Sequence, residues 1–185
     1  MGADTRQCVD LCKGHRSPLT GQPVAVLGAG GIYDGRGLAA ALALGAAAVW
    51  VGTRFVAAEE AAVGPRHQQA VVNTSSDDTV RTTIFSGRPM RVMKNDYIME
   101  WETKRQHERD ALLAEGKRPY KNDLTVNEEA GTPLDFLATY PNILGQASGG
   151  IHEVLPAETI VHDMVQGAID VIRAQSALLG AAANL

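Results

Sequence analysis

The sequence of 185 residues contains only two cysteines, Cys8 and Cys12. A spacing of four places both thiols on one face of a helix, and no further cysteine or cluster of histidines is present to complete a zinc site. We therefore expect no metal centre and two reduced thiols. Reduced thiols are typical of a protein in the cytosol or an organellar matrix, and we expect a cytoplasmic location.

The sequence also lacks the features that would direct it to a membrane or to a nucleic acid. No apolar stretch reaches the roughly 18 uncharged residues of a membrane helix. The first residues, MGADTRQCVDLCKGH, contain no apolar core of a secretory signal. The net charge is −4 at pH 7, and no basic run alternates with aromatic residues. We therefore expect neither a membrane nor a nucleic-acid partner.

The most informative segment is VAVLGAGGIYDGRGLAAALALGAAAVWVGTRF, residues 24–55. It contains two apolar runs, each followed by glycine, which we predict to be parallel strands over Val24–Leu27 and Ala48–Val51, covered on both faces. The residues between them predict a helix that begins after Asp34 as N-cap and ends before Gly45. Strand, helix and strand in this order form one βαβ unit.

The remaining segments show weaker patterns. No repeat or linker interrupts them, so we predict one domain over residues 1–185. The predicted elements are a short helix over Ala3–Lys13, a helical segment over 56–74 broken at Gly64–Pro65, a hairpin from 79–85 and 89–95, a charged outer helix over 96–116, an irregular segment over 117–142, and a last helix from Pro156 with apolar Ile160, Val161, Met164, Val165, Ala168, Val171 and Ile172 on its packed face.

Glycines at the two strand ends permit a particular chemistry. Glycine lets a ligand approach the backbone, and the N–H groups that start a helix attract anions, most often phosphate. We therefore interpret Gly30, Gly31, Gly52 and Thr53 as an anion site, with tight turns that bind nothing as the alternative. Two such ends in adjacent units are typical of the last strands of a (β/α)8 barrel, whereas the glycine spacing does not fit the dinucleotide fingerprint.

These residues resemble a known family. AGGIYDGRGLAAALALGA with VWVGTRF, DDTVRTTIFSGRPMRV, GQASGGIHEVLPAETIVHDMV and VDLCKGHRSPLTG are similar to the C-terminal half of the nitronate monooxygenases, formerly 2-nitropropane dioxygenases. The resemblance implies an α/β fold, an FMN-binding TIM barrel, and oxidation of alkyl nitronates with dioxygen. Carried over by position, it implies that the FMN phosphate contacts Gly30, Gly31, Trp50, Val51, Gly52 and Thr53.

A TIM barrel usually needs roughly 250 residues and eight strands, whereas only two barrel strands can be placed here. We therefore expect a partial barrel made of the last βα units with a C-terminal helical and β extension. The N-terminal strands, and the histidine that the resemblance suggests as catalytic base, would lie outside this chain, so we assign no catalytic residue. His152 is interpreted as a polar residue that flanks the last helix. Open sheet edges predict self-association.

Two other functions stay open at this point. The chain could be a non-catalytic remnant that binds a phosphate-bearing ligand or completes another chain's barrel. It could also be part of another flavin barrel enzyme, such as an FMN-dependent enoyl reductase, because these enzymes share much of the glycine motif.

Several side chains near these motifs could contact a ligand, but a structural role explains them as well. We expect Asp34 to cap its helix and Arg54 to form a salt bridge with Asp34. We expect Tyr97 and Trp101 to be packing anchors. By resemblance, Gln146 and Gly149 are further candidates for contacts near the flavin edge.

Overall fold

A computed structural model describes residues 2–182 of the chain. Its contacts group into two compact units, one formed by residues 1–72 with 150–185 and the other by residues 73–149. The single domain expected over residues 1–185 stays a prediction. None of the helices within residues 2–182 is both long enough and apolar enough to cross a membrane.

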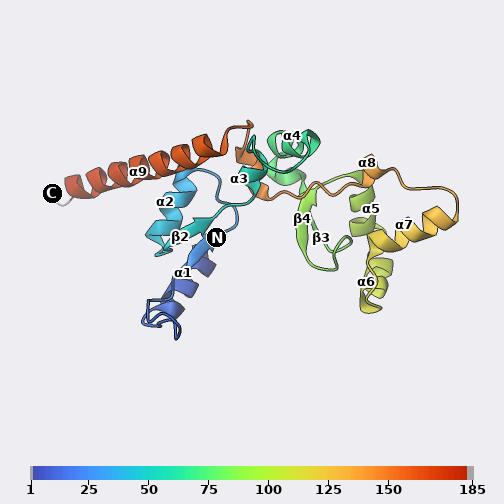
Figure 1. The fold of residues 1–185 in the computed structure, drawn as a ribbon, viewed down its shortest axis with the longest axis horizontal. Helices are drawn as coiled ribbons and strands as arrows, with labels where there is room; N and C mark the ends of the chain where they lie inside the picture. Colours follow the sequence, from blue (N-terminus) through green and yellow to red (C-terminus); the bar gives the residue numbers. More distant parts are fainter. Residues whose placement is uncertain (1, 183–185) are drawn as a thin grey trace. The chain divides into compact units, whose positions relative to one another are not determined.

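The first unit carries the βαβ segment, and its helices and strands are shown in Figure 1. They are α1 (Gly2–Cys12), β1 (Leu27–Ala29), α2 (Gly35–Ala43), β2 (Ala48–Trp50), α3 (Thr53–Val56), α4 (Pro65–Asn73, ending at the boundary of the unit) and α9 (Ala157–Ala182).

The predicted strands are adjacent and parallel, with α2 between them in the chain. Leu27 pairs with Ala48, and Ala29 pairs with Trp50. This confirms the βαβ unit, although β1 begins three residues later than predicted because only Leu27–Ala29 lies beside β2. The residues before Leu27 are not part of the strand, although the Ala47 N–H donates to the Val26 carbonyl at 2.8 Å.

The prediction that both faces of these strands are covered is wrong. The face toward α2 is closed, since Gly28 is buried and a Cβ added to it would lie 3.3 Å from the Cβ of Ala41. The opposite face is open, with Leu27 50% and Trp50 72% exposed. One crossover helix covers one face of a two-stranded sheet, so the other face keeps its apolar side chains in solvent.

The core of the first unit lies between α2, β2 and the start of α9. Its buried members are Ile32, Ala41, Ala46, Ala58, Ile160 and Met164. Helices α2 and α9 cross where Gly35 meets the backbone of Gly167 and Ala168, and a Cβ on Gly35 would lie 2.5 Å from the Ala168 nitrogen. The absence of a side chain at Gly35 therefore sets how closely these helices pack.

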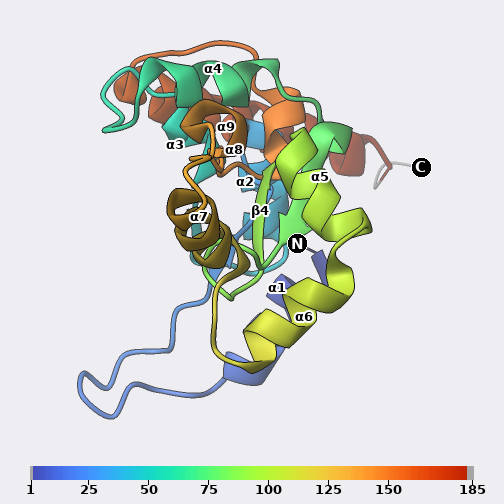
Figure 2. The ribbon, with the colours of Figure 1, turned by 90° about the vertical axis from the view of Figure 1, so that its right-hand side faces the viewer.

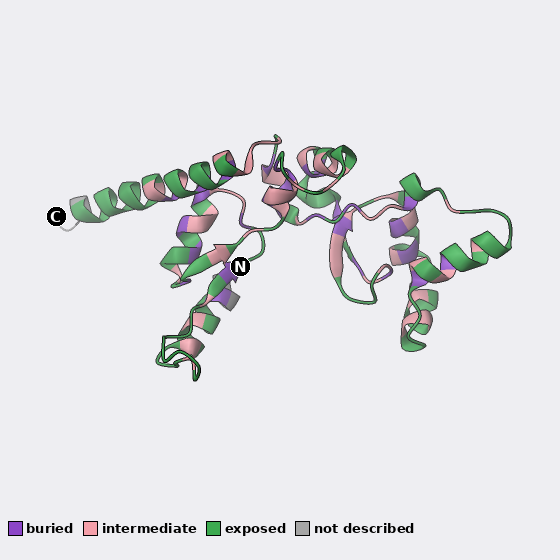
Figure 3. Ribbon diagram, viewed as in Figure 1, coloured by how far each residue is buried: buried purple, intermediate pink, exposed green. Residues whose placement is uncertain are grey.

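The predicted apolar face of α9 is confirmed in part. Ile160, Met164 and Ala168 are buried against the unit, whereas Val161 and Val165 on the neighbouring turn positions are about half exposed. Figure 3 shows that exposed residues dominate the part of α9 beyond this contact. The helix begins at Ala157, one residue after the predicted Pro156, and the Ala157 N–H donates to Glu60 Oε2 at 2.8 Å.

The second unit contains a hairpin and several short helices. They are η1 (Ser76–Asp78), β3 (Thr79–Thr82), β4 (Met90–Met93), α5 (Asp96–Thr103), α6 (Gln106–Ala114), α7 (Pro119–Glu129), α8 (Phe136–Thr139) and η2 (Gln146–Gly150, whose last residue belongs to the first unit). Strands β3 and β4 pair antiparallel, which confirms the hairpin. Its loop contains Gly87 at φ +74°, a value that favours glycine.

The single charged outer helix predicted over 96–116 is wrong. The segment forms two helices, α5 and α6, which meet at an angle in Figure 2. Helix α5 is an inner helix, because Ile98 and Trp101 are fully buried in the core of the unit with Ile84 and Val92. Its charged residues Asp96 and Glu100 are exposed, whereas Glu102 accepts from Thr82 Oγ1 at 2.6 Å. The average charge of the segment therefore concealed a buried face.

Two other segments differ from expectation. The irregular segment predicted over 117–142 contains α7 and α8, and α7 begins with Pro119 at its first position. The helix predicted over 56–74 is confirmed only over Pro65–Asn73, since residues 57–64 form turns and one bridge to the segment before α9. Helix α7 was missed because its attachment is confined to buried Pro119, to Tyr120 against Phe85 and Tyr97, and to the polar contacts of Asp123, which make no continuous apolar stripe.

Candidate phosphate site at two strand ends

The parallel register brings the two glycine-containing strand ends together. Since Ala29 lies opposite Trp50, the residues that follow each strand leave the sheet at the same edge. Gly30 and Gly31 follow β1, and Val51 and Gly52 follow β2 (Figure 1). The structure therefore places the strand-end glycines of the sequence prediction at one edge of one sheet.

The glycines at this edge have open space beside them. Gly30 and Gly31 have φ values of +86° and +75°, which residues with a side chain rarely adopt. A Cβ added to Gly30, Gly31 or Gly52 would meet no atom within 4 Å, leaving aside the neighbouring residues in the chain. The backbone is thus exposed where a phosphate would have to approach it, so the residues present fit such a group.

The start of α2 is already occupied by a side chain. Asp34 Oδ1 accepts from the Gly37 N–H at 2.8 Å, and Arg36 Nε donates to Asp34 Oδ2 at 3.3 Å. This confirms Asp34 as N-cap. The cap occupies the Gly37 N–H, and binding of an anion by the other N–H groups at the start of α2 stays a prediction. By contrast, α3 follows Gly52 without a side-chain cap.

The other proposed contacts differ in environment. The Trp50 side chain belongs to the open face of the sheet and is largely exposed. Val51 is half-buried against the apolar core. Thr53 is half-buried and is the first residue of α3. Trp50 and Val51 could therefore contribute backbone groups at this edge, and the role of all six residues in binding a cofactor stays a prediction.

Arg54 differs from its sequence prediction. It is buried, with 6% of its surface exposed, and its NH2 donates to the carbonyl oxygen of Glu153 at 3.1 Å. The expected salt bridge with Asp34 is replaced by the Asp34–Arg36 pair. The chain turns into α3 after Gly52 instead of continuing as a strand, which directs Arg54 inward. Burial lowers its pKa, while the charges of Glu153 and Asp163 act in the opposite direction.

A small cavity of about 160 Å³ lies next to Arg54. Its walls come from the β1–α2 loop, α3 and the segment that leads into α9: Tyr33, Asp34, Gly35, Arg54, Gly150, Leu155, Ile160, Asp163 and Met164. Tyr33 closes one side, since a Cβ on Gly150 would lie 2.3 Å from its ring. Two carboxylates face one guanidinium here, so the cavity itself does not suit an anion.

The structure adds no catalytic base to the site. Histidine is absent from the residues that line this cavity, and His152 is an exposed residue before α9. His162 lies on α9 and approaches Asp163 at 3.9 Å. The expectation that the base lies outside this chain stays a prediction.

Gln146 and Gly149 have structural roles in the second unit. The Gln146 carbonyl accepts from Ser76 Oγ at 2.8 Å. A Cβ added to Gly149 would lie 2.2 Å from the same Ser76 Oγ. Gly149 therefore allows Ser76 to pack against the backbone of η2. Contact of either residue with a flavin stays a prediction.

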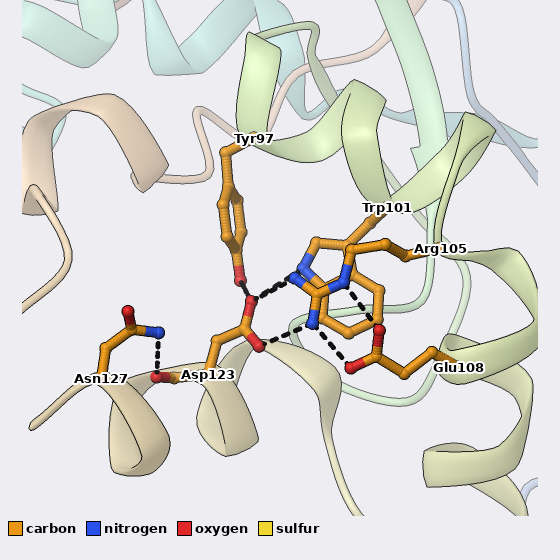
Figure 4. Close-up of polar contacts among 6 residues, drawn as sticks. All are labelled: Tyr97, Trp101, Arg105, Glu108, Asp123 and Asn127. Atoms are coloured by element: carbon orange, nitrogen blue, oxygen red, sulfur yellow. Dashed lines mark hydrogen bonds and ion pairs between the residues drawn. The ribbon is translucent and has the colours of Figure 1, made fainter. Parts of the chain in front are cut away.

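A polar cluster in the second unit was not foreseen. Asp123 of α7 is buried and accepts hydrogen bonds from Tyr97 OH, Trp101 Nε1 and two nitrogens of Arg105 (Figure 4). Arg105 also stacks over the Trp101 ring at 3.6 Å from its centroid and pairs with Glu108. The spacing of Tyr97, Trp101 and Arg105 by four residues could have indicated one common partner.

Known proteins resemble this chain over most of its length. A family profile described as nitronate monooxygenase matches residues 5–167. Nitronate monooxygenase npaC of Metarhizium robertsii is 35% identical over 149 residues, which are 76% of this chain and 40% of that protein. The chain spans about two fifths of the length of the curated relatives that match most of it.

Solved structures share the arrangement of the elements. FabK from Thermotoga maritima aligns with a TM-score of 0.61 and 32% identity, over 84% of this chain and 47% of FabK. The nitroalkane oxidase of Streptomyces ansochromogenes aligns with a TM-score of 0.59 and 26% identity, over 82% of this chain and 41% of that protein. In each case the match is to less than half of the solved chain.

Proposed function

The chain belongs to the nitronate monooxygenase family, and we propose that it is the phosphate-binding, carboxyl-terminal part of an FMN-dependent enzyme of that family. The complete enzyme would oxidise alkyl nitronates with dioxygen. The observation that carries the proposal is the pair of glycine-containing strand ends at one sheet edge, with open space beside Gly30, Gly31 and Gly52.

The barrel is part of the same proposal. The face of β1 and β2 that bears Leu27 and Trp50 is apolar and exposed, and both strands have a free outer edge within the described residues. Further parallel strands beside β1 and β2 would continue this sheet, and closing it would make that face the barrel interior. Without those strands, the open edges favour association between copies of the chain.

The residues at and after the ends of β1 and β2 have different roles in the proposed phosphate site. Gly30, Gly31 and Gly52 admit the phosphate to the backbone, and Trp50, Val51 and Thr53 flank it with backbone groups and one hydroxyl. Asp34 holds the start of α2 and keeps the β1–α2 loop in place through Gly37. When bound, FMN supplies the transfer of electrons from the nitronate to oxygen, and the chain orients it.

Gly52→Val is the variant that tests the phosphate site. Gly52 has a φ of −107°, so a side chain there strains nothing, and its surroundings are open. We expect FMN affinity, measured by flavin fluorescence, to fall about tenfold or more, the equivalent of ~1.4 kcal/mol. Gly64→Val is the matched control, since its surroundings are also open and it lies outside the edge. Unchanged FMN affinity in Gly52→Val would refute the site.

The two alternatives, an enoyl reductase and a non-catalytic binding remnant, can be distinguished from this proposal by the substrates that the complete enzyme consumes. Within the complete enzyme, an enoyl reductase would oxidise a reduced nicotinamide cofactor in the presence of an unsaturated thioester, and a nitronate monooxygenase would consume oxygen with an alkyl nitronate. A binding remnant would do neither, although it would still retain a phosphate-bearing ligand at the strand ends.

A further inference from the structure

Arg54 follows the proposed phosphate-site residues directly in the chain. It is the second residue of α3 and follows Gly52 and Thr53. It is also among the few buried charged residues of the described chain. A buried charge destabilises a fold unless other groups compensate it, so its presence next to this edge requires an explanation.

The guanidinium is compensated by a neutral group and by charges at longer range. Its described hydrogen bond goes to the Glu153 carbonyl, and within residues 2–182 no carboxylate forms an ion pair with it. Asp34 and Asp163 line the same cavity, but Asp34 is paired with Arg36. The charges of Asp163 and Glu153 compensate the guanidinium at longer range, so the specific contact of Arg54 is its hydrogen bond to the Glu153 carbonyl.

The Arg54 side chain lies next to both loops that contain the edge glycines, the β1–α2 loop and the β2–α3 connection. The cavity that it lines is also lined by Tyr33 and Asp34, which belong to the loop that begins with Gly30 and Gly31, and by Gly35, the first residue of α2. Its own backbone continues the β2–α3 connection. One side chain therefore lies against both strand-end loops.

A second set of contacts fixes the far end of this arrangement. The segment before α9 is bonded to the turn after α3, because the Leu155 N–H donates to Ala57 O at 3.2 Å and the Glu59 N–H donates to Leu155 O at 3.0 Å. Arg54 adds its bond to Glu153 two residues earlier. The side chain thereby connects α3 to a segment 99 positions away in sequence.

We propose that Arg54 is a positioning residue for the phosphate site, because its buried side chain holds the loop after Gly52 in place through the hydrogen bond to Glu153. This inference rests on the proposed function, because it assumes that the strand ends bind the FMN phosphate. The anion itself lies on the glycine side, since Asp34 and Asp163 make the cavity unsuitable for it.

The test compares FMN with riboflavin, which has the same ring system and no phosphate. Dissociation constants for both are measured by flavin fluorescence with the 185-residue chain and its variants. We expect Arg54→Met to lower the ratio of FMN affinity to riboflavin affinity about tenfold, and Arg54→Lys to recover part of the loss because it retains the charge and one donor. Arg173→Met removes the same charge from an exposed position of α9, outside both strand-end loops, and should change the ratio less than about twofold.

The outcomes are distinguishable. An unchanged ratio in Arg54→Met and Arg54→Lys would overturn the inference, as would an equal loss for both flavins, which indicates a merely structural role. If Arg54→Met does not fold, Arg54→Lys decides between these results. A wild-type chain that binds FMN no more tightly than riboflavin would instead refute the phosphate site, and the inference would fail with it.

Discussion

The carboxylate of Asp123 accepts two hydrogen bonds from the Arg105 guanidinium, at 2.9 and 3.0 Å. The two residues come from different helices, since Asp123 lies in α7 and Arg105 directly precedes α6. Because Asp123 also accepts from Tyr97 and Trp101 of α5, one buried side chain connects three helices of the second unit. This contact holds a helix whose own sequence has little apolar patterning.

Asp123→Asn should destabilise the second unit. It leaves Arg105 without its buried partner and weakens the acceptor of Trp101, for a loss of roughly 2–4 kcal/mol in the free energy of unfolding. Asp110→Asn is the control, because Asp110 pairs with Arg109 at an exposed position and should cost less than about 1 kcal/mol. Urea unfolding of both variants measures the difference, and equal small losses would show that the cluster does not hold the unit together.

Tyr97 makes the stability of this unit sensitive to alkaline pH. Burial, with the neighbouring Asp123 charge also contributing, raises the pKa of Tyr97 above its usual value of 10.0. The folded state therefore favours the neutral phenol, and this stabilisation is present below pH 10 and is lost as pH rises toward the folded pKa. We expect the free energy of unfolding to fall above pH 10 in the wild type and less steeply in Tyr97→Phe, with Tyr140→Phe as control. Parallel slopes would contradict the assignment.

Gly35→Ala should separate α2 from α9. The new Cβ would lie 2.5 Å from two backbone atoms of α9, and neither can move without shifting the helix, so we expect a loss of roughly 2–3 kcal/mol. Gly180→Ala, in the exposed part of α9 with open space around it, should instead be neutral or stabilising by up to about 1 kcal/mol. Thermal unfolding followed by circular dichroism would show opposite shifts, and a stable Gly35→Ala would mean that the two helices do not pack this closely.

The sequence was informative where local chemistry determines the structure. Asp34 was recognisable as an N-cap because a short acidic side chain before an alanine-rich run has a specific acceptor role, and the paired strands followed from apolar runs of strand length. The edge glycines could be predicted because a tight turn from a strand into a helix often needs a backbone conformation that glycine adopts most easily.

The rest depended on contacts between residues far apart in the chain. Burial of Arg54 requires Glu153, 99 positions later, and nothing in the local sequence reveals that partner. Helix α7 is attached by Asp123 to Arg105 and by Tyr120 to Phe85 and Tyr97, and a search for apolar periodicity does not detect these distant partners. Exposure of Trp50 could not be anticipated either, because a continuous apolar run looks the same whether one face or both faces are covered.

The central proposal is that this chain binds the FMN phosphate and that the amino-terminal part of the enzyme supplies the catalytic base. Oxygen uptake with an alkyl nitronate and FMN tests it most directly, measured for the chain alone and after mixing with the amino-terminal half of a complete relative. We predict no flavin-dependent uptake by the chain alone, because the proposed base, commonly worth about 10²–10⁴ in rate, would come from the amino-terminal part. We predict uptake when the two parts are combined. Turnover by the isolated chain near that of an intact relative would contradict the account.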